Sequence, residues 1–319
     1  MAVNLVRFGK GGLTGWGVAR DDGVVALSGS YASTRALIEE GAADWRAKRD
    51  AAPDVDDIDI LSPITAPARI VCQGANYRQH MIESGVDPDQ KRFNMFFEKS
   101  DASLTSATGD VRRPAHVKLL DYEIELGLVI GAPITMPLSV NRSNYHELLF
   151  GLVLANDVSA RDVQIPEIQF FKGKSYRSFC PMGPYLTALE GEDHKYIEAL
   201  DLKLWVNGAL RQADNSANMV NKPAETLTEM STFTDMDPGD VLLTGTPSGC
   251  ALRPPKPMMQ RVARALFDEA TLWRKFKENQ AKLPDYLQPG DVMSAEIKSA
   301  DGRINLGRQE NRIVQEAQQ

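Results

Sequence analysis

A series of short apolar runs separated by tight-turn signals constrains the fold most strongly. Two such runs, 202–206 and 209–212, flank Asn207-Gly208. Asn-Gly favours a type I′ hairpin turn, because both residues tolerate the positive φ that this turn requires. The pattern predicts antiparallel strands joined by hairpins, so we expect a mixed, mainly β fold. Further strands are expected at 69–73, 121–130, 149–155, 241–244 and 292–297, with a last hairpin turning at 301–302.

The first part of the chain has a different pattern from the rest. Short strands are expected at 4–8, 16–19 and 24–27, followed by a helix over 33–50. Prolines at 63 and 67 then mark a boundary. Because 319 residues suit about two domains, we expect a small N-terminal α+β domain at 1–66 and a larger, mainly antiparallel β domain at 67–319.

One segment near the C-terminus interrupts the β pattern. Apolar residues recur at near-helical spacing between 258 and 282, and prolines flank this stretch on both sides. We therefore expect a helical insertion at about 251–288 that carries an amphipathic helix. The favoured interpretation of its apolar stripe is packing against the core or against another subunit.

Charge and cysteine content exclude several classes of protein. With 36 Lys and Arg against 43 Asp and Glu, the net charge is −7, so we expect no nucleic-acid or membrane partner. No apolar run resembles a signal peptide or a membrane span. Cys72, Cys180 and Cys250 are far apart and form no Cys-x-x-Cys pair. We expect three buried free thiols in a cytoplasmic protein.

Three acidic residues could form a metal site. Glu123 and Glu125 would share one face of a strand, because side-chain direction has a period of two. Asp157 follows a buried apolar run. Three carboxylates suit Mg²⁺ or Mn²⁺, with Ca²⁺ as a further possibility, better than zinc. Glu-x-Glu alone is more often an ordinary solvated strand face.

The residues after Asp157 allow two interpretations. If a helical turn begins there, Asp157, Arg161 and Gln164 lie on one face and could hold a metal together with a substrate carboxylate. Alternatively, Asp157 caps the helix and forms an ion pair with Arg161. The residues alone leave both interpretations open.

Two further groups could take part in catalysis. His80 and Glu83 are three residues apart, so on a helix the carboxylate could orient the imidazole as a base that activates water. An accidental surface pair is the commoner outcome of this spacing. Lys174 lies among aromatic residues and could stabilise a developing oxyanion.

Taken in order, these segments resemble the fumarylacetoacetate hydrolase family over about residues 69–314. The matching motifs are Gly74-Ala75-Asn76-Tyr77-x-x-His80-x-x-Glu83, Asp121-Tyr122-Glu123-x-Glu125, Asn156-Asp157-Val158-Ser159-Ala160-Arg161-Asp162-x-Gln164, Lys172-Gly173-Lys174-Ser175 and Thr244-Gly245-Thr246-Pro247-x-Gly249. One departure is Ser100 after Lys99, where the family usually has proline.

The resemblance implies a role for each matching residue. It assigns Glu123, Glu125 and Asp157 to one Mg²⁺ or Mn²⁺ ion. His80 and Glu83 would form the dyad that activates water, and Lys174 would stabilise the reacting oxyanion. The substrate would contact the side chains of Arg161, Gln164, Tyr176 and Thr246. The family fold is a β-roll that usually forms a homodimer.

The resemblance also implies a reaction. The first expectation is a hydrolase acting on carbon–carbon bonds in ketonic substances, which would release pyruvate from an acylpyruvate such as fumarylpyruvate or maleylpyruvate in aromatic compound catabolism. The alternative is an isomerase or decarboxylase of a 2-oxo or 2-hydroxydienoic acid, oxaloacetate included. A third possibility is a non-catalytic module that binds a metal or an oxo acid.

Overall fold

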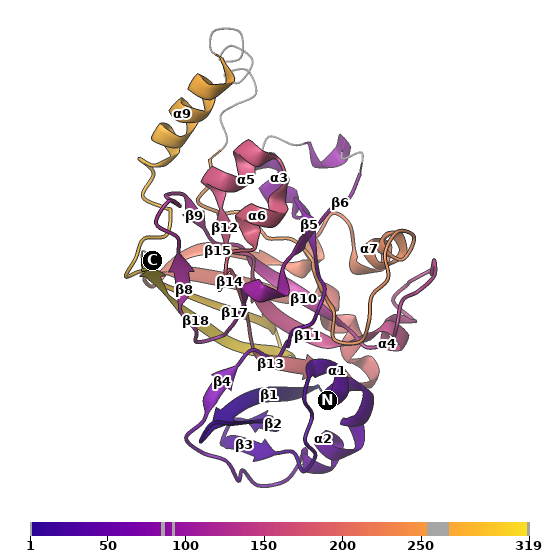
Figure 1. The fold of residues 1–319 in the computed structure, drawn as a ribbon. Coiled ribbons are helices and arrows are strands. Elements are labelled where there is room, and N and C mark those ends of the chain that lie inside the picture. The colour runs from indigo at the N-terminus through magenta and orange to yellow at the C-terminus, as the bar shows by residue number, and fades with distance from the viewer. Residues whose placement is uncertain (1, 84–86, 91–92, 254–267, 318–319) are drawn as a thin grey trace.

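Strands from the whole length of the chain form one large mixed sheet and a second, five-stranded sheet (Figure 1). The computed structural model describes residues 2–83, 87–90, 93–253 and 268–317. The expected mixed, mainly β class is confirmed. No helix within these residues is long and apolar enough to cross a membrane.

The large sheet has the N-terminal strands at one edge and the strands formed by residues 70–74 and 95–99 at the other. Its strand order is β3-β2-β1-β13-β11-β10-β16-β5-β6, with β4 paired to β1 and β7 paired to β13. The strands are β1 (Val3–Lys10), β2 (Leu13–Arg20), β3 (Gly23–Ala26), β4 (Asp59–Leu61), β5 (Ile70–Gly74), β6 (Met95–Lys99), β7 (Leu104–Ser106), β10 (Ile124–Ile130), β11 (Leu149–Asn156), β13 (Cys180–Ala188) and β16 (Val241–Leu243).

The second sheet has the order β15-β14-β17-β18-β8, and a short pair, β12 and β9, lies apart from both sheets. Asn207 and Gly208 both have positive φ between β14 and β15, which confirms the predicted hairpin turn. These strands are β8 (Val111–Arg113), β9 (Leu120–Asp121), β12 (Ser159–Ala160), β14 (Leu200–Val206), β15 (Ala209–Asn215), β17 (Val292–Ser299) and β18 (Asn305–Gln315).

Short helices connect and cover the strands. In Figure 1, α3, α5 and α6 gather at one end of the molecule, and α9 extends beyond them. The helices are α1 (Thr34–Glu40), α2 (Ala42–Lys48), α3 (Arg78–Glu83), α4 (Tyr145–Leu148), α5 (Arg161–Glu167), α6 (Phe170–Lys174), α7 (Pro223–Met230) and α9 (Glu269–Gln280). Short 3₁₀ turns include Pro88–Gln90, Asp101–Ser103, Gly191–Glu198 and Ser216–Asn218.

Strand β10 is buried on both faces and joins two apolar cores. Leu126 and Leu128 pack into the core that includes Leu202 and Ile297 of the second sheet. Val129 points the other way, into a core that contains side chains of the N-terminal segment. Alternation along the strand therefore places consecutive residues in different cores. Charged side chains at the start of this strand become buried as well.

Three expected elements differ from the structure. The helix expected over 33–50 is two helices, because Gly41 ends α1 and begins α2. The strand expected over 121–130 is interrupted between β9 and β10. The helix expected over 258–282 is described only as α9, and residues 254–267 lie outside the described residues. Of the side chains of α9, only that of Gln280 is buried, so its apolar residues do not pack in the core.

Candidate active site

Three carboxylates meet where β10 and β11 run side by side. Glu125 lies in β10, Glu123 just precedes that strand, and Asp157 follows β11. The antiparallel register pairs Ile124 with Asn156, and the Asp157 N–H donates to the Glu123 carbonyl over 2.8 Å. One oxygen from each carboxylate lies within 4.8 Å of the others, and all three residues are buried. The structure therefore brings together the three residues that the sequence predicted as ligands.

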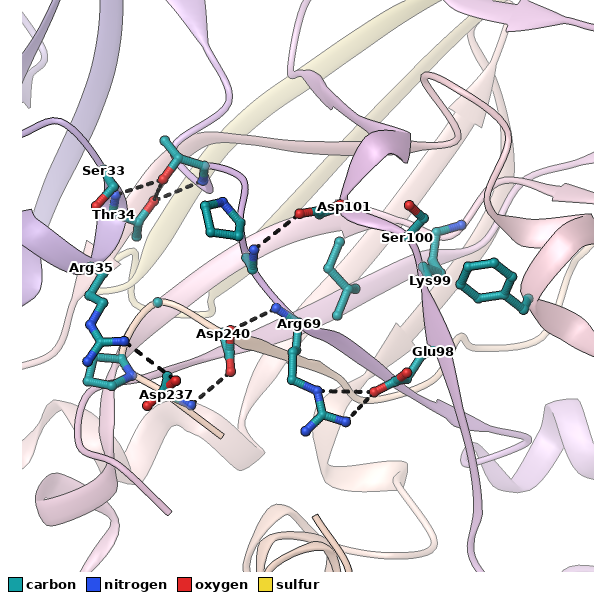
Figure 2. A pocket seen from close by; sticks show the side chains of 17 residues that line it. Ser33, Thr34, Arg35, Arg69, Glu98, Lys99, Ser100, Asp101, Asp237 and Asp240 are labelled. Carbon is teal, nitrogen blue, oxygen red and sulfur yellow. Dashed lines mark hydrogen bonds and ion pairs between the residues drawn. The ribbon is translucent and has the colours of Figure 1, made fainter. Parts of the chain in front are cut away.

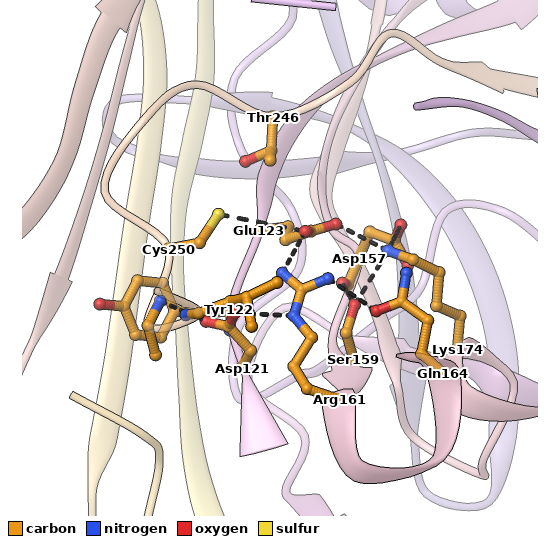
Figure 3. A network of polar contacts seen from close by, with 12 residues as sticks. Asp121, Tyr122, Glu123, Asp157, Ser159, Arg161, Gln164, Lys174, Thr246 and Cys250 are labelled. Atoms are coloured by element: carbon orange, nitrogen blue, oxygen red, sulfur yellow. Dashed lines mark hydrogen bonds and ion pairs between the residues drawn. The ribbon is translucent and has the colours of Figure 1, made fainter. Parts of the chain in front are cut away.

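Lysine and arginine side chains neutralise two of these carboxylates (Figure 3). Glu123 accepts hydrogen bonds from Arg161 and, over 2.7 Å, from the Lys174 ammonium. The same ammonium donates to Asp157, and Lys99 donates to the other Asp157 oxygen over 2.6 Å. Burial alone would raise the pKa of Glu123, but attraction by Arg161 and Lys174 outweighs it and holds this pKa below its usual range.

Glu125 has a different environment. Its carboxylate accepts a hydrogen bond from the Gly245 N–H over 2.8 Å, and among the described residues no Lys or Arg side chain forms an ion pair with it. Burial and then repulsion by Asp157 and Glu123 raise the pKa of Glu125 well above its usual range. A divalent cation would supply the missing positive charge, and three carboxylate oxygens are a donor set suited to Mg²⁺ or Mn²⁺. The residues present therefore fit a divalent metal.

The Lys174 ammonium is buried at the centre of the network. Besides the two carboxylates it donates to Ser159 Oγ over 2.9 Å, and it lies 5.0 Å from the centroid of the Phe97 ring. Burial would lower the pKa of Lys174, but attraction by Asp157 and Glu123 raises it. The sequence predicted an ammonium among aromatic residues; the ring beside it comes from β6, far away in the sequence.

The sequence assigned no site role to Lys99, which belongs to the same network. It ends β6 with 3% of its surface exposed. Its amine bonds to Asp157 and to the Lys174 carbonyl oxygen. The strand period of two places Lys99 on the same face as Phe97, beside Lys174. That alternation is a signal from which its inward direction could have been predicted.

Arg161 begins α5, and its side chain bonds to three neighbours. Its Nη1 donates to Gln164 Oε1 and its Nε donates to Asp121 Oδ2, each over 2.8 Å, in addition to the bond with Glu123. Both interpretations placed the start of the helix at Asp157, and that placement was wrong, although Asp157 does lie in the carboxylate cluster. This residue lies outside α5, whose N-cap is Ala160, and its ion pairs are with lysines rather than with Arg161.

His80 and Glu83 lie on α3, as the spacing predicts, but no hydrogen bond joins them in the described residues. Glu83 instead accepts from the Gly249 N–H at 3.3 Å. The His80 ring is half-buried, and burial lowers its pKa even though the charge of Glu123 acts to raise it. The lowered pKa favours the neutral imidazole at pH 7. A cleft of about 410 Å³ lies beside this helix, between Arg78, Gln79 and Ile82 and the loop with Ser248.

The two remaining residues predicted to contact the substrate, Thr246 and Tyr176, have different surroundings. Thr246 is buried, and its Oγ1 accepts a hydrogen bond from Gln212 Nε2 over 2.9 Å. Tyr176 is not part of the carboxylate network; its hydroxyl lies 2.9 Å from His116 Nε2. Cys250 is a buried free thiol, as predicted, and its Sγ lies 4.0 Å from Glu123 Oε1.

A cleft of about 510 Å³ lies between the N-terminal segment and the rest of the chain (Figure 2). Arg35 lines it from the N-terminal side, and Arg69, Asp101 and Asp240 line it from the other side. Its lining includes Lys99 but none of the three clustered carboxylates. The cleft therefore lies next to the candidate site without including the carboxylates.

Two curated relatives are similar over somewhat more than three fifths of the chain. An oxaloacetate tautomerase of Bacillus subtilis is 35% identical over 206 residues, which cover 63% of this chain and 67% of that protein. A mitochondrial oxaloacetate tautomerase of Xenopus laevis is 34% identical over 205 residues, or 62% of this chain and 61% of that protein. The match thus spans about two thirds of the length of these relatives.

The comparison of folds covers nearly the whole chain. A solved fumarylacetoacetate hydrolase from Exiguobacterium antarcticum superposes with a TM-score of 0.75 at 28% identity, covering 98% of this chain and all of that one. Residues 69–314 match the family described as fumarylacetoacetate (FAA) hydrolase, C-terminal. Over most of its length, therefore, this chain belongs to the fumarylacetoacetate hydrolase family of enzymes.

Proposed function

We propose that this chain is a metal-dependent enzyme that forms and stabilises the enolate of a small 2-oxo acid. The observation that carries the proposal is the buried cluster of Glu123, Glu125 and Asp157, with the Lys174 ammonium bonded to two of its members. A divalent cation held by these carboxylates would act as a Lewis acid toward the oxygens of the oxo acid.

The charge of the site favours an anionic substrate. Four buried carboxylates face three buried cations, which gives a formal charge of −1; these groups are Asp121, Glu123, Glu125, Asp157, Lys99, Arg161 and Lys174. A bound divalent cation would change this charge to +1. In a site shielded from water such a charge attracts a carboxylate strongly. The reacting carbonyl oxygen would lie beside the Lys174 ammonium, which can stabilise negative charge as it develops.

The first candidate reaction is keto–enol tautomerisation of oxaloacetate. The relatives bearing that name support it, and the reaction needs only a base, an acid and an enolate-stabilising site. His80 is the candidate base, because its neutral imidazole can take a proton from C3 of the oxo acid. The proton would return to the C2 oxygen of the enolate, or to C3 in the reverse direction.

The second candidate is hydrolysis of an acylpyruvate, the function that the sequence favours first. The same His80 imidazole, whose pKa feels the charge of Glu123, could accept a proton from an attacking water. In this structure, however, Glu83 bonds to Gly249 rather than to His80, so the water-activating pair is not assembled. We place tautomerisation ahead of hydrolysis because the curated relatives bear that name. Isomerisation or decarboxylation of a related 2-oxo acid would use the same enolate.

Product analysis on one purified preparation separates these reactions. The protein is incubated with Mn²⁺ or Mg²⁺ and with oxaloacetate or an acylpyruvate series. The enol signal is followed by absorbance and the products by mass spectrometry. Only hydrolysis adds the elements of water, and only decarboxylation releases CO₂. We expect accelerated enol–keto exchange that EDTA abolishes and that Lys172→Met, an exposed control beside the site, retains. Full activity in EDTA would refute the proposal.

A further inference from the structure

A fourth buried carboxylate lies beside the cluster without belonging to the proposed ligand set. Asp121 ends β9, and its side chain is fully buried. It accepts hydrogen bonds from Arg161 Nε over 2.8 Å and from the backbone N–H groups of Tyr122, Ala251 and Leu252 over 2.9, 2.7 and 3.1 Å. Four donors saturate this carboxylate, so its position is fixed.

One side of Asp121 orients a site residue. Because Nε of Arg161 is bonded to Asp121, the two Nη groups face the other way, toward Gln164 and Glu123 (Figure 3). A guanidinium is planar, so fixing one edge fixes the direction of the other donors. Because Arg161 also pairs with Asp121, its positive charge neutralises Glu123 less completely than it would if Glu123 were its only partner.

The other side of Asp121 holds the start of the inserted segment. The N–H groups of residues 251 and 252 are the first of that segment, and its far end returns to the same strand, where the Leu287 N–H donates to the Leu120 carbonyl over 2.9 Å. Gln280, at the end of α9, ties the two ends together. Its Nε2 donates to the Arg253 carbonyl over 2.6 Å, and its Oε1 accepts from the Tyr286 hydroxyl over 2.7 Å.

We propose that Asp121 is a positioning residue that couples the described ends of the insertion, 251–253 and 280–287, to the orientation of Arg161. These ends thereby contribute to how Arg161 holds the oxo acid and to specificity for it. This inference rests on the proposed function, in which an oxo acid is the substrate, and on the substrate contact that the family resemblance implies for Arg161. It adds a residue and a segment to which no catalytic role has been given.

The test compares two buried aspartates, each bonded to an arginine. Asp121→Asn preserves shape but places an amide or an uncharged oxygen against Arg161 Nε. The matched control is Asp193→Asn, which affects a fully buried aspartate bonded to Arg303 over 2.7 Å, outside the carboxylate network. We expect Asp121→Asn to raise KM for the oxo acid by about ten- to a hundredfold with kcat changed less than about threefold. The control should lose stability but keep KM.

A second variant tests the coupling itself. Gln280→Met releases the ties to Arg253 and Tyr286 at the far end of the segment without touching Arg161. We expect KM to rise in the same direction as for Asp121→Asn, by a smaller factor. An unchanged KM in Gln280→Met would overturn the role of the segment. This variant also tests the coupling if Asp121→Asn fails to fold.

Calorimetric binding of oxalate in the presence of Mn²⁺ separates two kinds of failure. If the wild-type protein binds no oxalate and turns over no oxo acid, the proposed function fails. If the wild type binds oxalate and Asp121→Asn binds it as tightly as Asp193→Asn does, only the present inference fails. We expect oxalate affinity to fall in Asp121→Asn by the same factor as KM rises.

Discussion

Replacing Glu125 by glutamine should stabilise the metal-free protein while abolishing its response to divalent cations. Glu125 is buried beside two other carboxylates and forms no ion pair with a Lys or Arg side chain among the described residues. Glutamine has nearly the same shape, and its carbonyl oxygen can keep the hydrogen bond from the Gly245 N–H. The substitution therefore removes the repulsion, or the proton uptake that relieves it, and little else.

The magnitude follows from the geometry. Two carboxylate oxygens no more than 4.8 Å apart repel each other by at least about 3 kcal/mol at an effective dielectric constant of about 20. Attraction by Lys174 and the Gly245 N–H offsets part of this repulsion. We expect Glu125→Gln to increase the free energy of unfolding by about 1–3 kcal/mol in EDTA. In the wild type, a cation at a hundred times its Kd should add about 2.7 kcal/mol.

Urea denaturation at pH 7, in EDTA and in Mn²⁺, measures both effects. We expect the variant to be the more stable protein in EDTA and the wild type to gain stability only with Mn²⁺. Calorimetry should show Mn²⁺ binding to the wild type and none to the variant. A variant that is less stable in EDTA would show that Glu125 is not a repelled ligand. A variant that still binds Mn²⁺ with wild-type affinity would remove Glu125 from the ligand set.

Three further predictions test the oxyanion site, the base and the packing. Lys174→Met should lower kcat by about a hundred- to a thousandfold in steady-state assays, whereas Lys172→Met should not; equal losses would contradict the assigned role. Because burial lowers the pKa of His80, its imidazole stays neutral into mildly acid solution. The fall in kcat/KM at low pH, which reports protonation of His80, should therefore occur below a pH of about 6.5. Any residual activity of His80→Gln should not show this fall. Gly151→Ala would bring a Cβ within 2.2 Å of a carbonyl oxygen, whereas Gly9→Ala meets nothing closer than 3.7 Å. In urea denaturation, Gly151→Ala should lower the free energy of unfolding by about 1–3 kcal/mol. Equal free energies of unfolding for the two variants would contradict the packing.

The features that the sequence predicted correctly depend on only a few adjacent residues. The turn at Asn207-Gly208 formed because both residues accept positive φ. Alternating or continuous apolar runs identified β10, β11 and β17 for the same kind of local reason. Motif order was enough to place the chain in its family, and it selected the three clustered carboxylates. Their proposed role as ligands is still a prediction.

The features that the sequence did not provide involve partners far apart along the chain. Lys99 reaches Asp157, and Asp121 joins Arg161 to the segment after Gly249, only after several strands have packed together. The local helix interpretation paired Arg161 with Asp157 because it considered only neighbours in sequence. In the folded chain, β9 pairs with β12 and brings a different carboxylate to that arginine.

The amino-acid sequence by itself determined the strands, the turns and the kinds of chemical group available, because backbone preference and side-chain periodicity act over a few residues. Only the tertiary structure decided which cation neutralises which carboxylate and which carboxylate is left without an ion-pair partner among the described residues. The physical reason is that electrostatic interactions depend on distance in space and on burial, and strand register sets both.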